Sequence, residues 1–73
     1  MDKQTQCMRV LQYIDENGSI TPLDALRELG VMRLSAVIFE LRRRGHDIIT
    51  TMITVKNRFG EPARIACYSR RAA

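Results

Sequence analysis

The side chains of this 73-residue chain that are best suited to chemistry are arginines, and they bracket one short segment. Arg33 stands at its start, and Arg42, Arg43 and Arg44 follow one another at its end. A guanidinium group binds phosphate oxygens and can donate two parallel hydrogen bonds to the edge of a guanine. The pattern therefore indicates contact with a polyanion, provided that the surrounding elements present these side chains on a surface.

Groups that catalyse reactions or bind metals do not form a recognisable set. His46 is the single histidine, and Cys7 and Cys67 lie far apart in the sequence at no metal-ligand spacing. The sequence also lacks a glycine-rich phosphate loop and a pair of carboxylates on one helix face. We therefore expect no enzymatic activity, no cofactor and no metal, and we expect both cysteines to be free, small buried hydrophobes.

The length of the chain sets the scale of the fold. Seventy-three residues make one domain, 1–73, whose small core must use nearly every periodic apolar position. No apolar run approaches the ~20 residues of a membrane span, and the N-terminal residues lack the apolar centre of a signal peptide. The sequence therefore predicts a cytoplasmic protein with no membrane partner.

The positive charge is concentrated in the second part of the chain. The whole chain has a formal net charge of +4. Residues 1–30 carry three basic and five acidic side chains, whereas residues 31–73 carry nine basic and three acidic ones. Such an asymmetry in a small domain is typical of a protein that binds a polyanion, although an arginine-rich surface also serves solubility alone.

The stretch 21–45 has the pattern of two helices joined by a tight turn that contains a glycine, a helix-turn-helix. Thr21 is a good N-cap and Pro22 suits the first helical position, which predicts a helix over 22–29. Gly30 favours the left-handed conformation that ends such a helix. The leucines of this helix recur at helical spacing, at Leu23, Leu26 and Leu29.

The second helix of the pair is predicted over 33–44 and ends at Gly45. Its inward face carries four apolar side chains, Leu34, Val37, Ile38 and Leu41. A projection at about 100° per residue gives an opposite face composed of Met32, Ala36, Phe39 and Arg43. This outer face is flanked by Arg33 and Glu40 on one side and by Ser35 and Arg42 on the other.

The rest of the chain predicts one more helix and a hairpin. A helix over 3–16 has a core-facing stripe of Cys7, Val10, Leu11 and Ile14. Ile20 can pair as a very short strand. Residues 48–56 are rich in β-branched side chains and return as a second strand over 62–69. The first strand has no single apolar phase, so it is twisted, bulged or covered on both sides near its start, and residues 70–73 should fray.

Several short segments of the chain resemble one family of known proteins. They are NGSIT at 17–21, ELGV at 28–31, RL at 33–34, ELRRRGHDI at 40–48 and VKNRFG at 55–60. With the order of three helices and a hairpin, they resemble the small winged helix-turn-helix proteins of bacteriophages and prophages. The resemblance implies an α+β fold, a three-helix core followed by a two-stranded β-hairpin wing. This chain has Met32 where a capping Ser or Thr is expected, with Ser35 as the alternative cap.

In a helix-turn-helix, the start of the second helix meets base edges and its later turns approach the backbone. We therefore expect DNA base contacts from the outer face of helix 33–44, at Arg33, Ser35, Ala36 and Phe39. We expect contacts to the DNA backbone or minor groove from Arg42, Arg43, Arg44, Lys56, Arg58 and Arg64. The three consecutive arginines also counter the helix dipole, and Phe39 has alternative places beneath the wing, at a sugar or at a second protein.

Two functions of different classes follow from this surface. The first is a double-stranded DNA-binding protein, a small phage-type transcriptional regulator that reads DNA with helix 33–44 and a basic wing. The second is a phage-encoded interaction module or inhibitor that binds an acidic protein surface with the same basic face. A single domain contacts few base pairs, so a homodimer or a protein partner is a further expectation.

Overall fold

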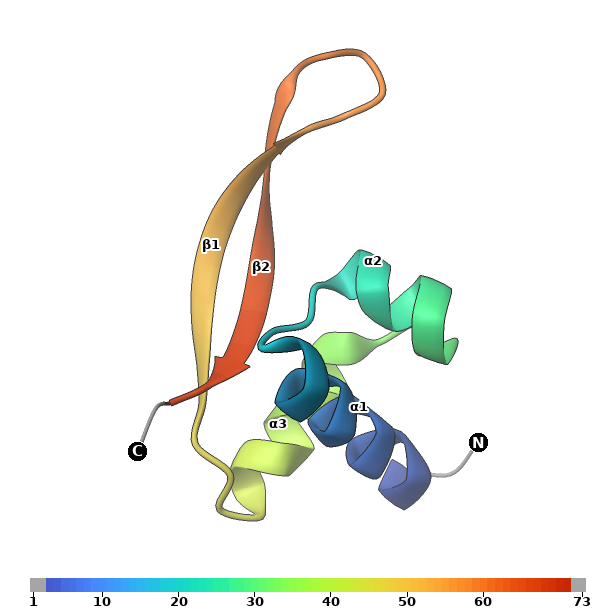
Figure 1. The fold of residues 1–73 in the computed structure, drawn as a ribbon, viewed down its shortest axis with the longest axis vertical. Helices are drawn as coiled ribbons and strands as arrows, with labels where there is room; N and C mark the ends of the chain where they lie inside the picture. Colours follow the sequence, from blue (N-terminus) through green and yellow to red (C-terminus); the bar gives the residue numbers. More distant parts are fainter. Residues whose placement is uncertain (1–2, 72–73) are drawn as a thin grey trace.

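The computed structural model describes residues 3–71, which form three helical segments followed by an antiparallel hairpin. The helices form a body at one end of the molecule, and the hairpin rises from it so that its loop lies well beyond them (Figure 1). This arrangement confirms the predicted α+β fold of three helices and a two-stranded hairpin. In chain order the elements are α1 (Lys3–Asn17), α2 (Pro22–Asp24), η1 (Ala25–Leu29), α3 (Leu34–Arg43), β1 (Ile48–Lys56) and β2 (Pro62–Arg70).

The second helix begins at Pro22 because Thr21 caps it, as predicted. The Thr21 hydroxyl accepts a hydrogen bond from the N–H of Asp24 at 3.2 Å, and the Asp24 carboxylate accepts one from the N–H of Thr21 at 3.1 Å. These reciprocal bonds form a capping box, which satisfies two N–H groups at the helix start. The helix ends at Gly30, whose φ of 68° lies in the left-handed region.

The second helix differs from expectation in its interior, where η1 is a π-helix. Leu23 and Leu26 are exposed, Leu29 is half-buried, and Ala25 is the buried residue of this segment. A π-helical turn closes i→i+5 hydrogen bonds, so the 3.6-residue spacing of the leucines does not define its inward face. Two large apolar side chains are therefore left on the surface.

The third helix begins at Leu34, one residue later than predicted. Arg33 is its N-cap and makes no side-chain capping bond, so Ser35 does not serve as the cap in place of Met32. The helix ends in a Schellman arrangement at Gly45, where φ is 98°. The Gly45 N–H donates to the Arg42 carbonyl and the His46 N–H to the Leu41 carbonyl, both at 3.0 Å. Gly45 therefore stops the helix, as predicted.

The core lies between the three helices and the base of the hairpin. Its buried side chains are Cys7, Val10, Ile14, Ile20, Ala25, Val31, Leu34, Val37, Ile38, Leu41, Ile48 and Tyr68. The predicted inward faces of the first and third helices are thus confirmed, with Leu11 half-buried at the margin. Glu40 contradicts the projection, because only 5% of it is exposed. Its carboxylate is buried where two arginines compensate its charge.

The two strands pair without a bulge, from Ile48 opposite Arg70 to Lys56 opposite Pro62. β1 is covered mainly at its base, where Ile48 is buried and Ile49 half-buried; farther along, Ile53 is half-buried and the other residues are exposed. Of the alternatives predicted for β1, a bulge is therefore wrong, and cover on both sides near its start is correct.

Ile20 pairs with β2 as the predicted short strand. Its N–H donates to the Tyr68 carbonyl at 2.8 Å, and the Tyr68 N–H donates to the Ile20 carbonyl at 2.9 Å. The segment between α1 and α2 is therefore joined directly to the base of the hairpin. Because Ile20 and Tyr68 are both buried, this bridge also lies at the edge of the core.

The prediction that the chain frays from residue 70 is wrong for Arg70 and Arg71. Arg70 ends β2 and forms an ion pair with Asp15 of α1 at 3.0 Å. Arg71 pairs with the Asp47 carboxylate at 2.8 Å, and its N–H donates to the Asp47 carbonyl at 3.0 Å. Both partners are remote in sequence, so composition alone did not indicate them. The predicted fraying of residues 72–73 lies outside the described residues.

Candidate nucleic-acid interface

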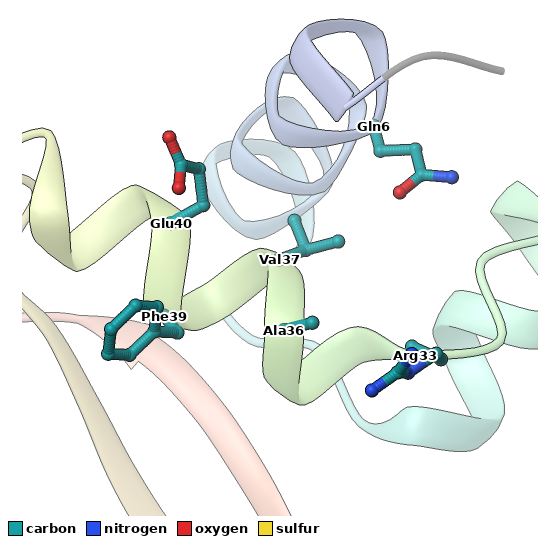
Figure 2. A pocket seen from close by; sticks show the side chains of 6 residues that line it. All are labelled: Gln6, Arg33, Ala36, Val37, Phe39 and Glu40. Atoms are coloured by element: carbon teal, nitrogen blue, oxygen red, sulfur yellow. The ribbon is translucent and has the colours of Figure 1, made fainter.

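Several side chains at the start of α3 are exposed and lie outside the core. Arg33, Ala36 and Phe39 are exposed and line one shallow pocket with Val37, Glu40 and Gln6 of α1 (Figure 2). Ser35 is also exposed on this helix. Phe39 is 68% exposed, so the alternative in which it packs beneath the wing is wrong. The structure thus places all four predicted base-contact residues on the accessible surface of α3.

Arg42 joins α3 to the wing. Its Nε donates to the Ile48 carbonyl at 2.9 Å, and one terminal nitrogen donates to the Thr50 hydroxyl at 2.8 Å. The side chain therefore bridges the last turn of the helix and the first residues of β1. Arg42 is exposed, so a phosphate contact would add to this structural role.

Arg43 and Arg44 share the buried carboxylate of Glu40. Two nitrogens of Arg43 reach the two carboxylate oxygens at 2.6 and 3.1 Å, and the Nε of Arg44 reaches one of them at 3.2 Å. The hydrogen bond to Glu40, with the attraction of its charge, raises the pKa of Arg43. The spacing of three and four residues on a helix favours these pairs. We refer to Glu40, Arg43 and Arg44 as the Glu40 cluster.

The wing carries the remaining predicted basic residues on its distal part. Lys56 ends β1, Arg58 lies in the loop, and Arg64 stands opposite Thr54 on β2; all three basic side chains are exposed. The loop is held by Asn57, whose side-chain oxygen accepts hydrogen bonds from the N–H groups of residues 59 and 61 at 2.9 and 3.0 Å. This small ordered turn presents Arg58 away from the helical body.

A second surface hollow, which was not predicted from the sequence, lies between the second helix and the wing. It is lined mainly by apolar side chains, from Pro22, Leu23, Leu26, Met32, Val55, Lys56, Asn57, Ala63 and Ile65. We call it the apolar groove. Lys56 therefore lies beside this groove and not in the Arg33 pocket. Two signals in the sequence could have indicated the apolar groove. The leucines of helix 22–29 had no predicted packing partner, and the apolar side chains of β1 pointed to both faces of the strand.

The predicted basic residues thus fall into three groups in space, one of which is the wing group described above. Arg33 shares its pocket with Ala36 and Phe39, whereas the arginines of the last turn are engaged with Glu40 and with the base of β1. The burial of Glu40 and its pairing with two arginines were not predicted, although its spacing of three and four residues from them was a visible signal. The arginine side chains bind Glu40 and β1 and not the last carbonyls of the helix.

Other types of site have no support within residues 3–71. No group of three or more His, Cys, Asp or Glu side chains in that range is placed to hold a metal ion. Cys7 is buried, Cys67 is half-buried, and both are free. None of the helices in the same range is both long and apolar enough to cross a membrane.

Comparison with known proteins identifies the family. A family model described as a winged helix-turn-helix domain matches residues 5–70, which include nearly all of α1 and every later element. No curated protein matches the chain, and no solved structure matches it. A domain of this type is typically a DNA-binding fold without enzymatic activity. On the extent of this match and the order of its helices and hairpin, the chain belongs to the winged helix-turn-helix family.

Proposed function

We propose that this protein binds double-stranded DNA with α3 in the major groove and the wing against the adjacent backbone or minor groove. One observation carries the proposal, namely the division of α3 into two faces. Leu34, Val37, Ile38 and Leu41 are buried, while Arg33, Ser35, Ala36 and Phe39 remain exposed at the start and middle of the helix. This is the part of the second helix that meets base edges in helix-turn-helix proteins.

The chemistry of the exposed residues suggests their roles. Arg33 can donate two hydrogen bonds to a guanine, Ser35 can bond to any base, and Ala36 fits beside a thymine methyl group. Phe39 supplies an apolar contact farther along the helix. The backbone contacts then come from Arg42, Arg43, Arg44, Lys56 and Arg64, and Arg58 in the loop reaches toward the minor groove.

We also propose that the protein acts in the cytoplasm as a small transcriptional regulator of the type encoded by bacteriophages. The support for this role is the resemblance of five sequence segments to such proteins. One copy presents a single helix for the major groove, which covers few base pairs. A specific operator is therefore expected to bind two copies, or one copy together with a partner protein.

The experiment that tests DNA binding is a titration of the full chain against a fluorescently labelled random-sequence duplex over a series of salt concentrations. Contacts to about six phosphates would give a log–log salt slope of about 5. Arg27→Ala is a suitable control, because Arg27 is exposed on η1 outside the proposed interface. A duplex that does not bind at low salt would contradict the proposal, as would a slope near zero.

The apolar groove favours a second candidate function, an interaction module for an acidic protein surface. Leu26 and Val55 give the groove an apolar lining, and Lys56 adds a positive charge at its side. A protein surface with an apolar centre and acidic margin would complement both features. If the chain fails to bind duplex DNA at low salt but binds an acidic polypeptide such as poly-glutamate, this second function is favoured.

A further inference from the structure

The C-terminal turn of α3 contains a buried carboxylate among exposed cations. The Glu40 side chain is 7% exposed, whereas those of Arg43 and Arg44 are 67% and 38% exposed. Glu40 points from α3 toward α1, and Phe39 points away from that helix (Figure 2). Glu40 also lines the pocket that contains Arg33 and Phe39, while the two guanidinium groups that it binds remain accessible to solvent. A charge in such a place must be compensated, because its removal from water is costly.

The hydrogen bonds of the cluster fix the two arginines in different ways. Arg43 binds both carboxylate oxygens through Nε and one terminal nitrogen, which is the bidentate geometry of the strongest arginine pairs. Arg44 binds one of these oxygens through Nε only. The carboxylate thus offsets part of the positive charge of the two arginines and holds both guanidinium groups in place. The nitrogens that do not face Glu40 remain available to a phosphate.

From this geometry we infer that Glu40 is an affinity-limiting residue, which weakens the electrostatic attraction of the DNA-binding surface for any duplex. The attraction between arginine and phosphate is independent of sequence, so it raises the affinity for every duplex alike. Glu40 lowers this general attraction at the end of α3, while the Arg33 side chain at its start makes no hydrogen bond or ion pair within residues 3–71. The electrostatic affinity for any duplex is therefore lower than three free arginines would allow. The inference rests on the proposed DNA binding.

The test is a double-mutant cycle read by DNA affinity. The variants are Glu40→Gln, the pair Arg43→Ala with Arg44→Ala, and the triple combination. Each is titrated against one random-sequence duplex over a series of salt concentrations. Glu28→Gln is the matched control, because it removes the same charge from an exposed position on η1. Circular dichroism and urea unfolding establish that each variant is folded before its affinity is compared.

We expect Glu40→Gln to bind the random duplex about 3- to 10-fold more tightly at low salt, with a salt slope steeper by about 1. The same change made in the Arg43→Ala, Arg44→Ala background should have little effect, because the cations that Glu40 screens are gone. Glu28→Gln should resemble the wild type. The inference is wrong if a folded Glu40→Gln protein matches Glu28→Gln, or if its gain persists without the two arginines.

A second comparison leaves Glu40 itself unchanged. Arg58 makes no hydrogen bond or ion pair within residues 3–71, so Arg58→Ala should lower the salt slope by about 0.9. Arg43→Ala should lower it by less than half as much, because Glu40 already screens that charge. Equal losses would overturn the inference. Failure of the wild-type protein to bind the duplex would instead contradict the proposed function, so the two failures are distinguishable.

Discussion

The Nε of Arg42 donates a hydrogen bond to the backbone carbonyl of Ile48 at 2.9 Å, so an arginine at the end of α3 fixes the first residue of the wing. A second bond, from its terminal nitrogen to the Thr50 hydroxyl at 2.8 Å, continues this connection along β1. The angle between helix and wing determines which two parts of a duplex the protein can contact at once. Under the proposed DNA binding, Arg42 would therefore contribute to recognition through the shape of the protein as well as through its charge.

The first prediction follows from this connection. Arg42→Ala should lower the free energy of unfolding by about 1–2 kcal/mol, because two hydrogen bonds are lost. The amide protons at the base of β1 should also exchange faster with solvent. Urea unfolding and hydrogen exchange measure the two effects, and Arg64→Ala, an exposed arginine on the wing, is the control. Equal stability of the two variants would show that the Arg42 bridge does not hold the wing.

The second prediction separates base reading from backbone contact. Arg33→Ala should cost ~1–3 kcal/mol of binding free energy on the best site and little on random DNA, because Arg33 lies where side chains reach base edges. Arg58→Ala should weaken both complexes about equally, since the wing meets phosphate or the minor groove. The best site comes from selection with a random duplex library. Indistinguishable losses for the two variants on both duplexes would exclude base reading by Arg33.

The third prediction concerns Phe39, which is 68% exposed on the proposed DNA-contact face of α3. Phe39→Ala should change the free energy of unfolding by no more than about 0.5 kcal/mol, because the side chain contributes little to the core. It should nevertheless weaken binding to the selected duplex. Ile38→Ala, at the adjacent buried position, should instead destabilise the fold by ~2–5 kcal/mol. A large loss of stability for Phe39→Ala would mean that the ring packs more closely than the structure shows.

The fourth prediction is a pH dependence at Tyr13. Partial burial raises the pKa of this phenol above 10.0, and the charges of Asp24 and Glu28 add to the shift while Arg27 opposes it. The unfolded chain thus loses this proton at a lower pH than the folded chain. The contribution of Tyr13 to stability is complete below pH 10.0 and declines as the pH rises through the folded pKa.

Tyr13→Phe provides the measurement for this effect. Urea unfolding of the variant and the wild type at a series of alkaline pH values should show a steeper loss of stability in the wild type. The absorbance of the phenolate reports the titration directly. Parallel curves for the two proteins would contradict the predicted shift, because the phenol would then titrate alike in the folded and unfolded states.

Local sequence patterns predicted the elements of this fold well. Thr21 capped its helix and Gly45 ended the next one, because both effects depend on residue type and on hydrogen bonds within a few residues. The apolar face of α3 was correct for the same reason, since a regular α-helix keeps its 3.6-residue period. The π-helical turn at Ala25 broke this regularity and left Leu26 exposed.

The remaining differences arose from contacts between distant parts of the chain. Arg70 appeared to be a free end, but it pairs with Asp15, which lies 55 residues away. Glu40 appeared to flank an exposed face, but its burial depends on how α1 packs against α3. The order of residues along one element cannot indicate these partners. For the proposed interface, the sequence therefore predicted which side chains are exposed better than it predicted how their charges are compensated.

The bridge between Ile20 and Tyr68 also has a consequence for folding kinetics. These residues are 48 positions apart in the sequence, yet each donates a backbone hydrogen bond to the other. Contacts between such distant residues require closure of a long loop, which slows folding relative to a helical bundle of the same length. The helices and the hairpin can each form from local contacts, but this bridge forms only when they meet. We therefore expect this bridge to form late in folding, when the helices and the hairpin pack together.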